Sequence, residues 1–234
     1  MLAHMGFGTR KQVRELIRKG NVRRNGTPIK QHGAKINVEK DTITVNGEII
    51  EYREFIYLML NKPQGVISAT FDHYEQTVVD LLPFDYVHFE PFPVGRLDKD
   101  TEGLLLLTND GKVAHLLTSP NRAIEKTYYA KISGAVTKEH VMEFKRGVTL
   151  DDGYRTKPGQ LTIVSSGTTS EIELTITEGK FHQVKRMFQA IGLQVVYLQR
   201  IKMGKISLDA NLSLGEIREL NERELAYIKQ LKQE

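Results

Sequence analysis

The sequence of 234 residues predicts an α+β protein made of a small basic head and a larger body. Three observations support this prediction. Two Asn-Gly hairpin signals follow one basic helical stretch near the N-terminus. Several later segments alternate between apolar and polar residues, as half-buried antiparallel strands do. A few stretches with helical spacing lie between those segments. We therefore expect a body with a mainly antiparallel mixed sheet, flanked by helices.

The head should begin with one helix. Thr9 can cap it, with Gln12 as the capping-box partner, and Gly20 suits the position just after its end. The apolar stripe of this helix is Val13, Leu16 and Ile17. Hairpins should follow at Asn25-Gly26 and Asn46-Gly47.

Positive charge is concentrated in the head. Residues 1–36 carry nine basic residues and one acidic residue, a charge of +8, while the whole chain carries only +4. A basic head suggests an anionic partner, most often nucleic acid. Arg10, Arg14 and Arg18 are spaced by four and should line one helix face, where guanidinium groups can bind phosphate oxygens. The alternative is a solvated face without a partner.

The boundary between head and body should lie near residue 54. A polar joint, Glu51–Glu54, precedes the apolar run Phe55–Leu60, which is stopped by Asn61-Lys62-Pro63. We predict domains at residues 1–53 and 54–234.

The body is organised around Val94–Gly111. Leu104–Leu107 should form a buried central strand, followed by an Asn-Asp-Gly turn at 109–111, whose residues tolerate left-handed backbone. Arg96, Asp98 and Asp100 should thus lie on a loop held by a rigid scaffold, where reactive residues are often found. The alternative is an ordinary charged surface loop. In an extended loop, Asp98 and Asp100 would point to opposite sides.

Further helices and strands complete the prediction for the body. Helical stretches are expected at 77–82, 112–117, 137–144 and from Asn221, and strands at 125–132, 161–164, 172–176 and 195–198. One more helix should bury Val184, Met187, Phe188 and Ile191 and end at Gly192. Lys185 lies at the edge of that stripe and can reach a neighbouring loop. Arg186 should face outward.

Composition and motifs argue against several functional classes. The chain has no cysteine, and its seven histidines are scattered singly, which argues against a metal centre. It has no Walker pattern, no G-x-G-x-x-G after a strand and no G-x-S-x-G elbow. No apolar run has membrane-spanning length, and no signal peptide is apparent. We expect a cytoplasmic protein without a metal or cofactor.

The head resembles the S4 RNA-binding domain, through GTRKQVRELIRKGNVRRNG at residues 8–26. The resemblance implies that the helix face and the next loop clasp structured RNA. Such domains usually open with a short Arg-Leu-Asp-Lys segment, whereas this chain begins Met1-Leu2-Ala3, so we expect a truncated first helix. The implied RNA-binding residues of the head are Arg10, Lys11, Arg14, Arg18, Arg23 and Arg24.

Four body motifs resemble those of ribosomal pseudouridine synthases. The match to the catalytic motif is GRLD at 95–98 followed by TEGLLLLTNDG at 101–111. YLMLNKPQG at 57–65 resembles the first motif, EKTY at 125–128 the tyrosine strand, and EGKFHQVKRM at 178–187 the last motif. The best match is the RsuA family, which pairs an S4 head with this catalytic body and its mixed-sheet fold.

The resemblance implies a chemistry. Such enzymes break the uracil N1–C1′ bond, rotate the base and rejoin it through C5, with no cofactor or metal. Asp98 is the implied essential carboxylate, which attacks C1′ or the base, or removes a ribose proton. Lys185 is the implied cation, which favours the ionised carboxylate. Tyr128 would stack on the flipped uracil and take part in proton transfer at C5, and Arg96 would help to extrude the nucleotide. Further RNA contacts are expected from Lys126, His182 and Arg186.

The motifs look most like the branch acting on one uridine of small-subunit 16S ribosomal RNA. A large-subunit 23S substrate is the first alternative, and a non-catalytic S4-type RNA-binding or assembly protein is the second. The expected partner is ribosomal RNA within a ribosomal subunit assembly intermediate, and the chain is expected to act as a monomer.

Overall fold

The computed structural model describes residues 1–233 and divides into two compact units. The head unit comprises Met1–Ile56 together with Pro83–Glu90, and the body unit comprises the remaining residues. The segment 83–90 therefore groups with the head unit, although the sequence places it inside the body. The predicted domain limits, 1–53 and 54–234, stay a prediction.

The head unit contains helix α1 (Arg10–Arg18) and a four-stranded sheet. Gln12 N–H donates to Thr9 Oγ1 and Thr9 N–H donates to Gln12 Oε1, which confirms the predicted capping box. The sheet order is β2-β1-β3-β4. Its strands are β1 (Val22–Arg24), β2 (Thr27–Pro28), β3 (Ile43–Val45) and β4 (Glu48–Ile49). The short helix α2 (Phe84–Val87) belongs to the same unit.

Both predicted hairpins of the head are present. Asn25 and Gly26 have positive φ, as do Asn46 and Gly47, and this is the backbone that a two-residue type I′ turn requires. The core of the unit contains Leu2, Val22, Ile43 and Val45. Residues 2–6 form hydrogen-bonded turns rather than a regular helix.

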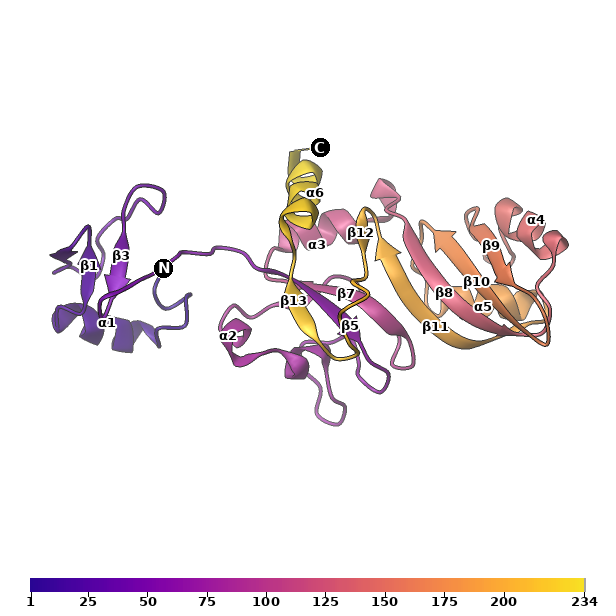
Figure 1. Ribbon diagram of the computed structural model, residues 1–234, viewed down its shortest axis with the longest axis horizontal. Coiled ribbons are helices and arrows are strands. Elements are labelled where there is room, and N and C mark those ends of the chain that lie inside the picture. The colour runs from indigo at the N-terminus through magenta and orange to yellow at the C-terminus, as the bar shows by residue number, and fades with distance from the viewer. Residues whose placement is uncertain (234) are drawn as a thin grey trace. The chain divides into compact units, whose positions relative to one another are not determined.

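The body unit contains a nine-stranded sheet in the order β13-β5-β7-β11-β8-β10-β9, with β6 on β7 and β12 on β11 (Figure 1). The strands are β5 (Tyr57–Lys62), β6 (Phe92–Pro93), β7 (Glu102–Thr108), β8 (Lys126–Ser133), β9 (Gln160–Ser165), β10 (Thr169–Ile176), β11 (Gln194–Met203), β12 (Ile206–Ser207) and β13 (Ile217–Glu219). The β7–β11 pair is parallel and the other pairs are antiparallel, which confirms the predicted class.

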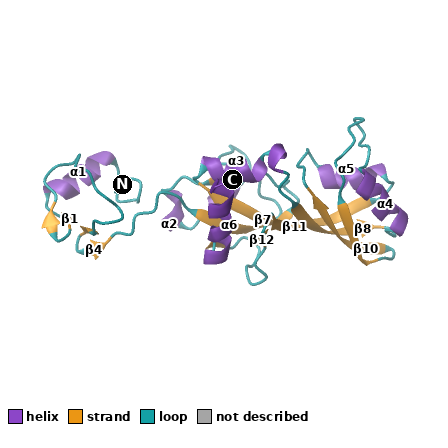
Figure 2. Cartoon of the chain, turned by 90° about the horizontal axis from the view of Figure 1, so that it is seen from above, coloured by secondary structure: helices purple, strands orange, loops and turns teal. Residues whose placement is uncertain are grey.

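Helices cover the two halves of this sheet separately, as Figure 2 shows from above. Helices α3 (Gly111–Thr118) and α6 (Glu222–Gln233) pack in one core with β5 and β7, through residues that include Val113, Leu117, Ile228, Leu231, Met59, Leu104 and Leu106. Helix α4 (Lys138–Arg146) contacts β9, and helix α5 (Gln183–Ala190) contacts β11. Two 3₁₀ turns, η1 (Val78–Leu81) and η2 (Pro120–Arg122), lie in the connections.

The two half-sheets meet at the parallel pair of β7 and β11. The register there joins Glu102 to Gln199 and Gly103 to Arg200. Gly103 has φ +101°, and a Cβ atom at this position would lie 2.3 Å from the carbonyl oxygen of Arg200. The glycine before the leucine run is therefore required by the close approach of the two strands.

The leucine run is the buried strand that the sequence predicts, but the turn after it differs from the prediction. Leu104, Leu105 and Leu107 are fully buried in β7. Asp110 has φ −89° rather than a left-handed backbone, and it caps α3, since its Oδ1 accepts from the N–H groups of Lys112 and Val113. An aspartate serves both turns and helix N-caps, and here the helix begins at once.

Candidate active site

The loop before β7 is a tight turn. The N–H of Thr101 donates to the carbonyl of Asp98 at 3.0 Å, the i to i+3 bond of a β-turn. The expectation that Asp98 and Asp100 point to opposite sides is therefore wrong, because the backbone reverses between them instead of staying extended. Both carboxylates approach the same lysine.

That lysine is Lys185 on α5, as the helix periodicity predicts. Its Nζ lies 2.5 Å from Asp100 Oδ1 and 3.4 Å from Asp98 Oδ2. Burial raises the pKa of Asp100, but the hydrogen bond and charge of Lys185 outweigh it and leave that pKa below its usual value. His182 Nε2 lies 3.7 Å from Asp98 Oδ2. Asp98 is thus a partly exposed carboxylate with two basic side chains at one oxygen.

A buried lysine supports the turn from inside. Lys62, at the end of β5, is 0% exposed, and its Nζ donates to the carbonyls of Pro63 at 2.9 Å, Thr101 at 3.0 Å and Asp98 at 3.1 Å. Burial lowers the pKa of Lys62 to about 8, although the carboxylates of Asp100 and Asp98 oppose this effect. One ammonium group therefore fixes the backbone that carries Asp98.

Further hydrogen bonds to the segment 65–68 hold the backbone of the turn. The Ser68 hydroxyl donates to the carbonyl of Leu97 and accepts from its N–H, at 2.9 and 3.0 Å. The N–H of Gly65 donates to the carbonyl of Lys99 at 2.8 Å. The segment after β5 and the Asp98 loop thus form one hydrogen-bonded assembly.

A second network positions the start of α5. The Glu178 carboxylate accepts from the Tyr154 hydroxyl at 2.5 Å, from the Lys157 N–H at 2.8 Å and from Gln183 Nε2 at 3.0 Å. His182 follows with a left-handed backbone, φ 47°, which costs energy in a non-glycine residue and persists only where its surroundings enforce it. This network sets the position from which α5 projects Lys185.

The catalytic candidates share one small pocket. Arg96, Asp98, Tyr128, His182 and Lys185 all line a cavity of about 70 Å³. Within this pocket, Tyr128 is 9% exposed and Asp98 is half-buried. The structure thus brings together the four residues predicted to be catalytic, together with His182.

A larger cavity of about 550 Å³ adjoins this pocket. Arg96 and Tyr128 line both, and the larger cavity also contacts Lys126, which is only 7% exposed. Lys126 is therefore an inner wall residue rather than a surface lysine, because its position on β8 faces the same side as Tyr128.

Arg186 does not face outward as the helix projection predicts. Its side chain is 16% exposed and its guanidinium pairs with Asp151 and, at 2.7 Å, with Asp152. The hydrogen bonds that Arg186 donates to these two carboxylates raise its pKa. The projection of residues around the helix axis considers α5 alone. In the structure, the turn at residues 151–152 covers this side of α5. Its RNA contact stays a prediction.

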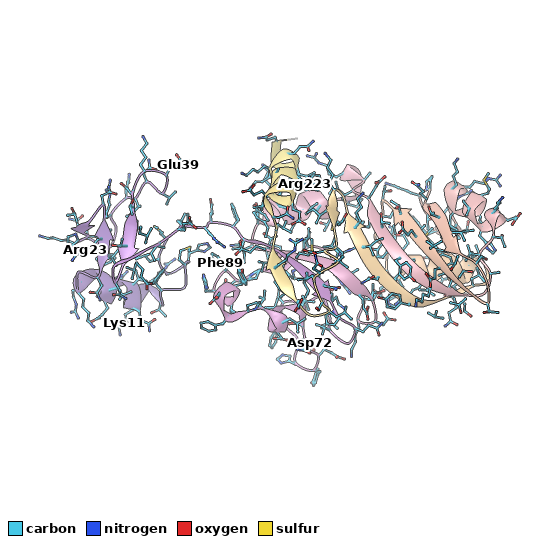
Figure 3. All side chains as sticks on the ribbon, in the orientation of Figure 1. Lys11, Arg23, Glu39, Asp72, Phe89 and Arg223 are labelled. Atoms are coloured by element: carbon cyan, nitrogen blue, oxygen red, sulfur yellow. The ribbon has the colours of Figure 1, made fainter. Side chains whose placement is uncertain are left out.

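The predicted RNA-binding residues of the head unit are all exposed: Arg10, Lys11, Arg14, Arg18, Arg23 and Arg24. Figure 3 shows the side chains of Lys11 and Arg23 at the surface of that unit. Two of the set have acidic partners, since Arg18 pairs with Glu15 at 2.6 Å and Arg24 with Asp41 at 2.9 Å. Their RNA contacts stay a prediction.

Sequence reasoning missed three residues around the site: Lys62, Asp100 and Arg200. Asp100 forms the shorter of the two ion pairs of Lys185. Lys62 lies at the end of an apolar strand, and a charged residue in that position could have marked it as a candidate site residue. Arg200 lies in a strand that continues five residues beyond the predicted limit, Leu198.

The described residues 1–233 contain no group of three or more His, Cys, Asp or Glu side chains that could hold a metal ion. No helix among them has the length and apolar character needed to cross a membrane.

Comparisons with known proteins identify the family. A model of the RNA pseudouridylate synthase family matches residues 56–190, and a model of the S4 domain matches residues 1–43. The chain therefore belongs to the RNA pseudouridylate synthase family, as an RsuA-type member with an N-terminal S4 domain. Its activity is the isomerisation of uridine in RNA.

Relatives cover nearly the whole chain. An RNA pseudouridine synthase of Bacillus subtilis, YtzG, is 51% identical over 96% of this chain and 95% of its own length. Ribosomal large subunit pseudouridine synthase B of the same organism is 41% identical, over 99% of this chain and 94% of that protein. Ribosomal small subunit pseudouridine synthase A of Escherichia coli is 38% identical, over 91% and 90%. A crystal structure of a pseudouridylate synthase superposes with a TM-score of 0.69 at 36% identity, covering 98% of this chain and 96% of that one.

Proposed function

We propose that the chain converts a single uridine of ribosomal RNA to pseudouridine with Asp98 as its one essential carboxylate and without a cofactor. The observation that supports this is the arrangement of Asp98 in the small pocket. Its carboxylate lies beside Lys185 at 3.4 Å, and its backbone is hydrogen-bonded to Lys62. A carboxylate must be ionised to attack the sugar or base or to remove a ribose proton, and a nearby cation favours that state.

The other pocket residues have separable roles in this proposal. Tyr128, on the inner face of β8, offers a flat ring on which a flipped uracil can stack and a hydroxyl for proton transfer at C5. Arg96 is exposed at the rim, where it can fill the space left by the extruded nucleotide. His182 is near enough to Asp98 to bind the same nucleotide.

The proposed substrate is small-subunit 16S ribosomal RNA, approached within an assembling subunit by a cytoplasmic monomer. The likeness of the motifs to that branch supports this choice. Large-subunit 23S RNA is the alternative, because relatives named for the large and the small subunit are 41% and 38% identical to this chain. The proposed head, residues 1–53, binds the RNA through its basic helix face.

The test of Asp98 is tritium release from uridine labelled at C5. We expect release by the wild-type protein on unmodified ribosomal RNA, and none above background by Asp98→Asn, which should still bind the RNA. Asp72→Asn is the matched control, because Asp72 lies in an exposed loop and lines neither cavity. Its activity should equal that of the wild type. Turnover by Asp98→Asn near the control level would refute the role of Asp98.

The choice of RNA needs a separate experiment. Carbodiimide treatment and primer extension on both ribosomal RNAs from a deletion strain should reveal one missing pseudouridine. A missing site in 16S RNA supports the proposed substrate, and a missing site in 23S RNA supports the alternative. If neither RNA changes while the strain accumulates subunit precursors, the assembly-protein interpretation gains support instead.

A further inference from the structure

The larger cavity beside the Asp98 pocket contains two buried cations. Arg200 is 3% exposed, and its Nε donates to the carbonyl of Leu104 at 2.8 Å. Its Nη2 is buried and has no hydrogen-bond partner. Lys126 is 7% exposed, and no hydrogen bond or ion pair joins its ammonium group to another residue of the described chain, 1–233. Arg200 and Lys126 lie on neighbouring strands, β11 and β8, and both line this cavity.

The charges of this cavity are not balanced from within. Burial lowers the pKa of Lys126, and the positive charge of Arg200 lowers it further. Glu178 is the one acidic residue in the lining, and its carboxylate is occupied by Tyr154, Lys157 and Gln183. A buried charge without a partner destabilises a fold, so two of them facing one cavity indicate that an anion binds there.

The position of the cavity identifies the source of the anion. The cavity shares Arg96, Tyr128, Gly179 and Lys180 with the Asp98 pocket, so the two spaces are continuous. For a nucleotide in the small pocket, the larger space offers a path for the sugar-phosphate chain on one side of it. A volume of about 550 Å³ suits a nucleotide-sized group. The planar guanidinium of Arg200 is held by its Nε bond and can offer its Nη groups to phosphate oxygens.

We propose that this cavity binds a phosphodiester group of the substrate RNA next to the target uridine, with Arg200 and Lys126 as its ligands. The inference rests on the proposed function, because it assumes that the uridine occupies the Asp98 pocket. A neutral uracil in the larger cavity would leave both positive charges uncompensated, so the phosphate is favoured over the base. Arg200 and Lys126 are thus binding residues for the RNA backbone, distinct from the basic face of the head unit.

The first test compares Lys126→Met with Lys131→Met. Both lysines lie on β8, but Lys131 is exposed on the opposite face of the strand, so the two variants lose the same charge from different places. Equilibrium binding of unmodified 16S ribosomal RNA transcript is measured across a range of salt concentrations. The magnitude of the slope of log K against log salt should fall by about 1 for Lys126→Met and stay unchanged for Lys131→Met. Equal slopes in the two variants would overturn the inference.

The second test uses small ligands and the wild-type protein alongside Lys126→Met and Arg200→Gln. The dinucleotide UpU contains one phosphodiester, and uridine contains none. The wild type should bind UpU about tenfold more tightly than uridine. Each cavity variant should lose this preference, while Lys131→Met keeps it. If Arg200→Gln does not fold, because its bond to Leu104 is lost, Lys126→Met alone decides.

A third ligand separates a phosphodiester site from a free-anion site. Inorganic phosphate, titrated against the wild type, should compete with UpU but not with uridine. If inorganic phosphate binds in a Lys126-dependent manner and UpU has no advantage over uridine, the cavity takes a free anion and the RNA assignment is overturned. Tritium release by the wild type without any Lys126 effect on binding would refute this inference and leave the proposed function standing. A Lys126-dependent preference for UpU without tritium release would leave this inference standing and refute the proposed function.

Discussion

The basic face of the head unit and the Asp98 loop of the body unit hold their charged groups differently. The first leaves them exposed to solvent, and the second fixes them by hydrogen bonds. In the head, Arg10, Lys11 and Arg14 project from one helix into solvent and make no ion pair within residues 1–233. In the body, the loop backbone is hydrogen-bonded to Lys62 and Ser68 before any RNA arrives. From this difference we expect the head to contribute electrostatic attraction for RNA and the body to contribute the fixed position of the Asp98 carboxylate.

This contrast follows from what each task needs. Phosphate binding by exposed arginines tolerates movement, because long side chains can follow the backbone and the force acts over several ångströms. Bond breaking at a sugar carbon requires the carboxylate in one place, where a misplacement of 1 Å can cost about 100-fold in rate. Substitutions in the two regions should therefore differ in kind as well as in size.

The largest effect is expected from Lys62→Met. The substitution removes the donor shared by the carbonyls of Pro63, Asp98 and Thr101, so the turn that carries Asp98 loosens. We expect kcat to fall by about 100-fold or more with little change in RNA affinity. Single-turnover tritium release and filter binding measure the two quantities.

Lys99→Met is the control for this prediction, since it removes the same charge from the Asp98 loop itself without removing the buried donor. Lys99 pairs with Glu75 across the surface, with side chains 50% and 43% exposed, and such a pair contributes at most about 1 kcal/mol. Its kcat should change less than threefold. Equal losses in the two variants would mean that loop charge, rather than the buried donor, matters.

Gly103→Ala tests the junction of the two half-sheets on which the geometry depends. Its Cβ would meet the Arg200 carbonyl at 2.3 Å, and the positive φ is strained for alanine. We expect a loss of unfolding free energy of about 1–3 kcal/mol, measured by urea denaturation. Gly111→Ala is the control, because no atom lies within 4 Å of its Cβ position. A Gly103 variant as stable as this control would show that the strands can separate freely.

Much of this architecture could be predicted from local sequence signals. The capping box at Thr9, the Asn-Gly hairpins and the buried leucine run of β7 each depend on neighbouring residues in the chain, and the structure has them. The orientation of Lys185 toward a loop could be predicted because α5 has a clear apolar stripe.

The errors involve contacts between distant segments. Asp98 and Asp100 converge on Lys185 because the loop turns under the control of Lys62, which lies 36 residues earlier. Arg186 is covered by the 151–152 turn, which no periodicity within α5 reveals. The unpaired Nη2 of Arg200 depends on where β11 lies beside β7 and β8. Periodicity predicts which side of one element is buried, but not which segment covers it.

A smaller effect is expected from pH. The pKa of Lys62 is about 8 in the folded chain, so its ammonium group loses a proton as pH rises through 8 and keeps fewer donors for the loop carbonyls. Activity should fall between about pH 8 and 9.5. In the unfolded chain the lysine keeps its proton to about pH 10.4, so in this window the unfolded state binds more protons. The contribution of Lys62 to stability therefore rises with pH while activity falls.

Two profiles check this opposite behaviour. Single-turnover rates and urea midpoints are measured from pH 7 to 10 for the wild type and for Lys62→Met. In the variant, activity should not fall as pH rises through 8. Its stability should rise less with pH than that of the wild type, because the contribution of Lys62 is absent. The same falling limb in the variant would assign it to another group.

The smallest effect per residue should come from the head, and it should appear in salt dependence rather than in chemistry. Arg14→Ala should lower the magnitude of the salt slope of RNA binding by about 1, Arg18→Ala should lower it by less, and both should leave single-turnover rates at saturating RNA unchanged. Arg18 shares its charge with Glu15, so its effect should be the weaker of the two. Arg223→Ala, an exposed arginine on α6 of the body unit (Figure 3), should leave the slope unchanged. If Arg14→Ala instead reduces the single-turnover rate at saturating RNA, the head also helps to position the uridine. The proposed separation, with RNA attraction in the head and carboxylate positioning in the body, would then be wrong.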